Sequence, residues 1–169
     1  MNARVLVAGV GDITLSDDGF GVEVVRRLRD VPEGVEVVDF GLRARDLAFQ
    51  LLDGYTALVL VDAISRGAAP GTLYALEHDL TSGDPVAPSL GAGHQIDPDT
   101  VLNMIVELAA AFGEKPPARV VVVACEAASF DEGIGLSPPV AAAVERAVAA
   151  VREIATELEG SHRVPGHSR

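Results

Sequence analysis

The stretch VLVAGVGDITLSDDGFG at residues 5–21 joins a short apolar segment to the start of a helix through two glycines. Residues 5–8 are wholly apolar, which predicts a buried strand. The glycines of the following Gly-Val-Gly permit a tight turn with close backbone approach. Apolar residues then recur at helical spacing, at Val22, Val25 and Leu28. The stretch therefore predicts a strand, a turn and a helix, the first unit of an α/β fold.

The rest of the chain repeats this alternation. Further strands are predicted at residues 35–40, 57–61, 71–76 and 119–125, and further helices at 44–52, from Asp97-Pro98 to about Gly113, and from Ser137-Pro138 onward. The third and fourth strands are too close in sequence for a crossover helix, so the fourth is expected to run antiparallel, at an edge. The predicted fold class is a layered α/β domain with a mostly parallel sheet.

Composition limits the kind of protein. The chain of 169 residues is 49% hydrophobic with a mean hydropathy of +0.29, which suits one α/β domain at residues 1–159 followed by a disordered tail at 160–169. Its longest wholly apolar run is far too short to cross a bilayer, and residues 1–8 lack the apolar region of a signal peptide. We therefore expect a soluble, cytoplasmic protein that has no membrane partner.

Charge and cysteine content narrow the choice further. The formal net charge of −12 should repel phosphate backbones, so nucleic acid is not an expected partner. The same charge would attract cations or basic peptides, although it also serves solubility. A single cysteine, Cys125, excludes an internal disulfide and a multi-cysteine zinc site. Because Cys125 ends an apolar strand, it is expected to pack in the core rather than to act as a nucleophile.

Three side chains are predicted to converge where ligands bind in open α/β sheets, outside the carboxyl ends of the strands. Asp18 follows the first strand, Asp62 follows the third, and His94 lies in a glycine-containing loop ahead of Asp97. Each has an ordinary alternative: helix capping for Asp18, amide bonding for Asp62, and solvent exposure for His94. Together, two carboxylates and an imidazole suit nickel or zinc and leave coordination positions open.

At this point the sequence resembles a known family. Gly-x-Gly, Asp17-Asp18-Gly19-x-Gly21, Val61-Asp62-Ala63, His94-Gln95 and Gly135-Leu136-Ser137-Pro138 occur in the order found in the hydrogenase maturation endopeptidases. The resemblance implies a three-layer α/β/α domain with a five-stranded, mostly parallel twisted sheet. It also implies removal of the carboxyl-terminal extension from a [NiFe]-hydrogenase large-subunit precursor after nickel insertion. By resemblance, Asp18, Asp62 and His94 are the metal ligands and the catalytic residues.

The resemblance further implies that nickel arrives with the substrate, and that zinc or cadmium can replace it in crystals. Water would attack the scissile carbonyl, activated either by the metal or by one of the carboxylates. Four positions depart from, or add to, the family pattern. Asp12 stands where Asn is common, Asp18 where some relatives have Glu, Gly41-Leu42-Arg43 replaces a loop with a small hydroxyl residue, and Glu126 matches a family acid whose role is either structural or a substrate contact.

Two further functions remain open. A nucleotide-binding module would use Gly9-Val10-Gly11 as its phosphate turn and Asp39 as its ribose contact, but Thr14 occupies the third glycine position of that fingerprint. In that module Asp17 and Asp18 would also repel the phosphate. A non-catalytic chaperone that binds the metallated precursor would share every ligand with the peptidase.

Overall fold

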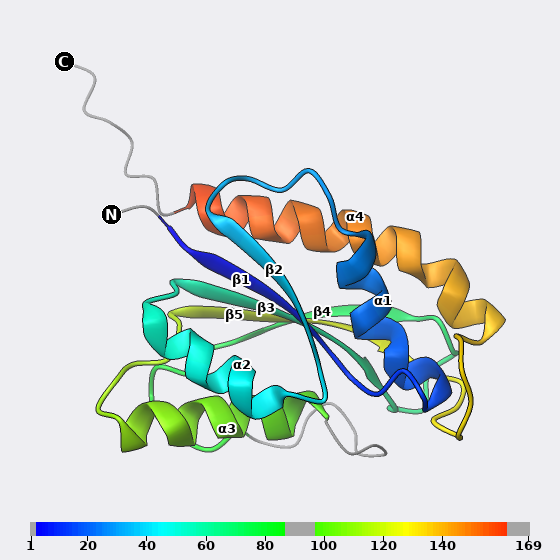
Figure 1. Ribbon diagram of the computed structural model, residues 1–169, viewed down its shortest axis with the longest axis horizontal. Coiled ribbons are helices and arrows are strands. Elements are labelled where there is room, and N and C mark those ends of the chain that lie inside the picture. Colours follow the sequence, from blue (N-terminus) through cyan, green and yellow to red (C-terminus); the bar gives the residue numbers. More distant parts are fainter. Residues whose placement is uncertain (1–2, 87–96, 162–169) are drawn as a thin grey trace.

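The computed structural model describes residues 3–86 and 97–161, which form a twisted sheet between two layers of helices (Figure 1). The strand order is β2-β1-β3-β5-β4. The strands are β1 (Val5–Val10), β2 (Val35–Gly41), β3 (Ala57–Ile64), β4 (Leu73–His78) and β5 (Arg119–Glu126). The helices are α1 (Phe20–Arg27), α2 (Ala44–Gln50), α3 (Pro98–Ala111) and α4 (Pro138–Gly160), with short 3₁₀ turns η1 (Ser16–Gly19) and η2 (Leu51–Asp53).

The sheet is parallel except at one edge. The strand pairs β1–β2, β1–β3 and β3–β5 are parallel, and β4 pairs antiparallel with β5. This confirms the antiparallel edge strand expected from the short connection after β3. Strand order reverses between β1 and β3, because the chain leaves β1 toward β2 on one side and returns to β3 on the other. Ligands of such sheets bind outside the carboxyl ends of the strands at this reversal.

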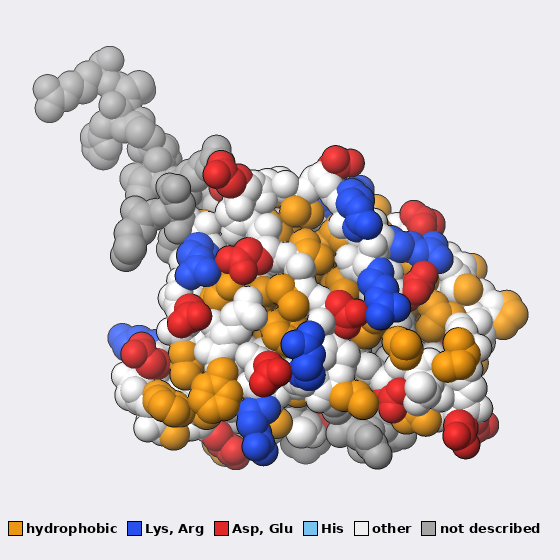
Figure 2. Space-filling model, in the orientation of Figure 1, with side chains coloured by type: hydrophobic (Ala, Val, Ile, Leu, Met, Phe, Trp, Pro, Cys, Tyr) orange, Lys and Arg blue, Asp and Glu red, His pale blue; other side chains and the backbone are white. Residues whose placement is uncertain are grey.

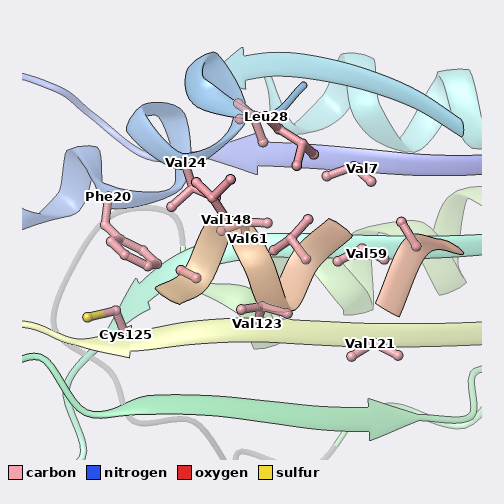
Figure 3. Close-up of a cluster of buried hydrophobic side chains, with 14 of the residues drawn as sticks. Val7, Phe20, Val24, Leu28, Val59, Val61, Val121, Val123, Cys125 and Val148 are labelled. Carbon is pink, nitrogen blue, oxygen red and sulfur yellow. The ribbon is translucent and has the colours of Figure 1, made fainter. Parts of the chain in front are cut away.

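Both faces of the sheet are buried, which explains the nearly unbroken apolar strands. The face under α1 and α4 carries the odd-numbered residues of β1, β3 and β5, and the face under α2 and α3 carries the even-numbered ones. Figure 3 shows the first of these clusters, in which side chains from α1 and α4 pack on side chains of three strands. The labelled residues are Val7, Phe20, Val24, Leu28, Val59, Val61, Val121, Val123, Cys125 and Val148. Burying each such side chain stabilises the fold by about 1.5–3 kcal/mol.

Several element boundaries differ from the sequence prediction. β3 continues to Ile64, so Asp62 lies inside the strand instead of after it. Phe112 continues the helical spacing of Val101, Ile105 and Leu108, which predicts that it packs on the sheet, but it is the C-cap residue of α3 and is 59% exposed. Its ring meets that of Phe49 edge to face with centroids 5.8 Å apart. Because α3 ends at Ala111, the helical periodicity no longer turns Phe112 toward the sheet.

Two other expectations concern the chain as a whole. α4 runs to Gly160, so the helix includes the first residue of the predicted tail, and residues 162–169 lie outside the described part. None of the helices in the described ranges is long and apolar enough to cross a membrane.

Glycine at position 21 lets α1 lie directly against the strand ends. A Cβ on Gly21 would lie 2.1 Å from the carbonyl oxygen of Val61 and 2.7 Å from that of Val10. Both contacts are with backbone, which cannot rotate away. The residues that carry the candidate ligands are therefore held together by a helix–strand contact that admits no side chain.

We expect Gly21→Ala to destabilise the protein by about 3 kcal/mol, because overpacking here must displace a helix from two strands. Urea unfolding followed by circular dichroism measures the change. Gly160→Ala is the matched control, since nothing lies within 4 Å of a Cβ at that helical position. Equal stability of the two variants would contradict the close-contact explanation.

Candidate functional site

Asp18 and Asp62 lie at the point where strand order reverses. Asp18 is in η1, which follows the turn after β1, and Asp62 lies near the carboxyl end of β3. Both side chains are buried, at 1% and 0% exposure. The two carboxylates predicted from distant parts of the sequence are therefore brought to the same edge of the sheet.

Asp62 is an unusual carboxylate because it is fully buried with little compensation. Its Oδ1 accepts a 2.8 Å hydrogen bond from the amide of Ala63, and its Oδ2 has no hydrogen-bond partner among the residues that the structure describes. Burial raises the pKa of Asp62 well above its ordinary value, and the negative charges of Asp18 and Asp97 raise it further. A buried anion beside other anions favours a proton or a cation as its partner.

Both the side chain and the backbone of Asp18 are held by the turn after β1. Its Oδ2 accepts a 2.8 Å hydrogen bond from the amide of Asp12 in the preceding turn. Gly11 has φ +130°, and a Cβ there would lie 2.0 Å from the carbonyl oxygen of Asp18. The second glycine of the Gly-Val-Gly sequence is therefore required both by its backbone conformation and by the close approach of Asp18.

The third predicted ligand, His94, lies outside the described residues. The chain is described again from Asp97, whose Oδ1 accepts a 2.8 Å hydrogen bond from the amide of Thr100 and caps α3 as predicted. The start of α3 is close enough to Asp62 for the charge of Asp97 to add to the burial and the Asp18 charge that raise the pKa of Asp62. Within residues 3–86 and 97–161, no group of three or more His, Cys, Asp or Glu side chains could hold a metal ion.

Asp17 has a role that the sequence prediction missed. Its position just before a helix suggests helix capping, but its carboxylate instead binds the loop between β5 and α4. Oδ1 accepts from the amide of Ser137 at 2.7 Å, and Oδ2 accepts from the amides of Ala128 and Ser129 and from the Ser137 hydroxyl. The contact between Asp17 and Ser137 joins residues 120 positions apart, so no local pattern could reveal it.

Two other acids also hold loops in place. The Asp12 carboxylate accepts from the amide and hydroxyl of Thr14 at 2.8 and 2.6 Å, as expected for an acid that replaces Asn in this turn. These bonds lower the pKa of Asp12. The Oε1 atom of Glu126, at the end of β5, accepts 2.8 Å bonds from the amides of Arg66 and Gly67. Glu126 therefore fixes the connection that follows β3 through one oxygen, while its buried Oε2 has no hydrogen-bond partner among the described residues.

The alternative chemistries find little support in this geometry. Cys125 is buried in the core as predicted, and burial raises its pKa to about 12, so it is not a thiolate nucleophile. Asp39, the proposed ribose contact, forms a 3.1 Å ion pair with Arg26. A phosphate at the glycine turn would meet the buried carboxylate of Asp18, which already accepts the Asp12 amide.

We expect Asp17→Asn to destabilise the protein by about 2 kcal/mol. The side-chain NH₂ of Asn is a hydrogen-bond donor, and it would face the backbone N–H donors of the β5–α4 loop that now bind the Asp17 carboxylate. The free energy of unfolding in urea measures this change. Asp30→Asn is the control, since Asp30 is exposed and has a positive φ of 59° that Asn tolerates well. Unchanged stability of Asp17→Asn would show that these hydrogen bonds do not hold the loop.

The buried charge of Asp62 predicts a site that costs stability. Above the folded-state pKa, Asp62 is ionised in both states, and its burial then disfavours folding. We therefore expect Asp62→Asn to raise the urea midpoint of the metal-free protein at pH 7.5. This gain should shrink as pH falls toward the unfolded-state value of about 3.9, because the native Asp62 then takes up a proton. Exposed Asp84→Asn should show no such dependence, and a lower midpoint for Asp62→Asn across the whole range would contradict the assignment.

Comparison with known proteins gives one consistent result. A family model described as HycI, hydrogenase maturation protease, matches residues 22–154. The hydrogenase 2 maturation protease of Escherichia coli K12 is 33% identical over 162 residues, covering 91% of this chain and 94% of that protein. HupD, a hydrogenase expression/formation protein of Rhodobacter capsulatus, is 31% identical over 156 residues, covering 89% of this chain and 71% of that protein. The solved structure of the hydrogenase maturating endopeptidase HybD from Escherichia coli matches with a TM-score of 0.73 at 29% identity, over 91% of this chain and 93% of that one. The chain is therefore a peptidase that belongs to the hydrogenase maturation protease family.

Proposed function

We propose that this peptidase removes the carboxyl-terminal extension of a [NiFe]-hydrogenase large-subunit precursor after nickel insertion, and that Asp18, Asp62 and His94 contact the nickel that the precursor carries. The observation that carries this proposal is the buried Oδ2 of Asp62, which lacks a hydrogen-bond partner in the described part of the chain and lies beside Asp18. Such a group is costly to keep unless it serves a ligand.

A metal on the substrate would make recognition depend on nickel loading. Burial raises the pKa of Asp62, and the charge of Asp18 raises it further, so a second anion is disfavoured beside Asp18 in the free protein. A divalent cation presented by the precursor supplies the missing positive charge, whereas an unloaded precursor does not. Oxygen and nitrogen donors of this set suit nickel, and zinc or cadmium would fit the same donors.

His94 enters the proposed set through the motif order that this chain shares with the hydrogenase maturation proteases. It precedes Asp97 by three positions in the sequence and lies outside the described residues. An imidazole would add a nitrogen donor to the two carboxylates, which suits nickel.

The chemistry asked of the site is hydrolysis of one peptide bond. The buried carboxylates hold the metal-bearing segment, which fixes the adjacent scissile bond relative to a water molecule. The bound metal supplies charge that can polarise the carbonyl or the water. Asp18 and Asp62 are the nearby groups able to accept the proton that the attacking water loses.

Exposed apolar side chains around this edge favour a protein as the substrate. Ile13, after β1, is 43% exposed, and Ile134, between β5 and α4, is 80% exposed. Both belong to loops at the carboxyl ends of the strands, where they would be covered by a large partner.

We infer a cytoplasmic location, because the peptidase must encounter the precursor after nickel has been inserted and before the hydrogenase subunits assemble.

We expect Asp18→Asn, Asp62→Asn and His94→Ala each to lower processing of the nickel-loaded precursor by at least about 1,000-fold, because each removes a contact to the metal. Mass spectrometry before and after incubation detects loss of the extension. The control is Asp84→Asn, which should process normally.

Mass spectrometry and a calorimetric titration together separate the alternative functions. Binding of the loaded precursor by the unmodified protein without any loss of mass would identify a chaperone. Normal processing by all three variants would reject the site. Heat released on titration with a dinucleotide would instead support the nucleotide-binding module.

A further inference from the structure

A cleft of about 340 Å³ is lined in part by Gly11 and Asp12, the turn residues that contact Asp18, and is not used by the proposed metal contacts. Its walls are the turn after β1, the face of α1 that carries Val22 and Arg26, and residues 39–43 at the end of β2. β2 is an edge strand, so the cleft lies at that edge of the sheet. Acidic, basic and apolar side chains are interspersed over the face of the molecule that Figure 2 shows.

The cleft shares its inner wall with the candidate site. The Gly11 amide donates a 3.0 Å hydrogen bond to the carbonyl oxygen of Gly41, which ties the turn after β1 to the end of β2. The next amide in that turn, from Asp12, donates to the carboxylate of Asp18. A single extended segment bound at Asp18 would therefore continue into the cleft within a few residues.

The apolar part of the cleft is left facing water. Leu42 is 52% exposed and Ile13 is 43% exposed, and both line the cleft together with Phe40 and Val22. Large apolar side chains in contact with water favour an apolar occupant, since covering them releases about 25 cal/mol per Å². This part of the cleft therefore suits an apolar side chain.

The charged part has one arginine whose charge is poorly compensated. Arg26 forms a 3.1 Å ion pair with the Asp39 carboxylate. Arg43 instead donates to the Asp39 backbone oxygen at 2.7 Å, lies 5.6 Å from the centre of the Phe40 ring, and reaches the Asp46 carboxylate only at 3.9 Å. Its side chain is 59% exposed. Arg43 is therefore positioned at the rim of the cleft to donate hydrogen bonds to a carboxylate of a ligand.

We propose that this cleft selects the precursor by the segment next to the scissile bond, which places an apolar side chain against Leu42 and a neighbouring Asp or Glu at Arg43. The inference rests on the proposed function and adds the class of peptide sequence that this chain accepts. Local charge complementarity favours this occupant: of the two acids in the lining, Asp39 is paired with Arg26 and Asp12 accepts hydrogen bonds from Thr14, whereas the exposed Arg43 has its carboxylate neighbour Asp46 only at 3.9 Å. Leu42 and Arg43 are thus specificity-determining residues.

A charge-reversal experiment tests the assignment. The enzymes are the unmodified protein, Arg43→Glu and the control Arg45→Glu, which makes the same charge change on an exposed side chain of α2 that does not line the cleft. The substrates are the nickel-loaded precursor and versions in which each Asp or Glu within six positions of the scissile bond is replaced by Lys. Processing rates give kcat and KM for each pair.

We expect Arg43→Glu to lower kcat/KM by about tenfold through KM, and one of the Lys precursors to restore it by a similar factor. That same precursor should be a poorer substrate for the unmodified enzyme, and Arg45→Glu should behave as the unmodified enzyme does. Leu42→Ser should also raise KM several-fold, because it removes apolar contact without altering charge.

Thermal unfolding of each variant separates loss of the fold from loss of binding. Should Arg43→Glu fail to fold, Arg43→Gln keeps a donor for the Asp39 carbonyl and should still raise KM, by a smaller factor. Unmodified rates for the Arg43 and Leu42 variants on every precursor would overturn the cleft assignment while leaving the proposed function intact. Absence of processing by the unmodified enzyme would overturn both.

Discussion

The structure depends on keeping two carboxylates out of water where the strand order reverses. Asp62 is fully buried near the end of β3, and Asp18 approaches it from the turn after β1. Left to itself, this arrangement would exclude one of the two groups or protonate it. The surrounding contacts prevent exclusion: α1 lies on the strand ends at Gly21, and the Asp12 amide holds the Asp18 carboxylate. The cost falls on Asp62, whose pKa is raised by burial and by its neighbours.

The other buried acids show how this cost is normally avoided. Asp17 is as buried as Asp62, yet its oxygens accept three backbone amides and a hydroxyl. Glu126 offsets part of the cost, since one oxygen accepts two amides and fixes the loop after β3, while its Oε2 has no hydrogen-bond partner among the described residues. Adjacent residues Asp17 and Asp18 have therefore separated into a structural clamp and a candidate ligand. The difference arises from what surrounds each side chain, since their chemistry is identical.

The proposed chemistry uses the stored electrostatic cost for recognition. A site whose anions lack a counter-ion binds best to a substrate that brings one, so a precursor with its metal is favoured over one without. The adjoining cleft would then read the peptide next to the metal through an apolar surface and one guanidinium. The candidate metal-contact site and the cleft would then recognise the nickel and the peptide sequence of one precursor side by side. The two are adjacent because the turn after β1 both lines the cleft and binds the Asp18 carboxylate.

The sequence by itself determined the order and type of the elements, the antiparallel edge strand, the core position of Cys125 and the choice of Asp18 and Asp62 as candidates. These features follow from local periodicity, from glycine and proline positions, and from motif order, all of which act over short stretches of chain. Only the tertiary structure decided that Asp17 binds the loop before α4, that Glu126 holds the loop after β3, and that Leu42 and Arg43 line a cleft. Each of these contacts joins residues from separate elements, and burial and partner identity exist only once the sheet and helices have packed together.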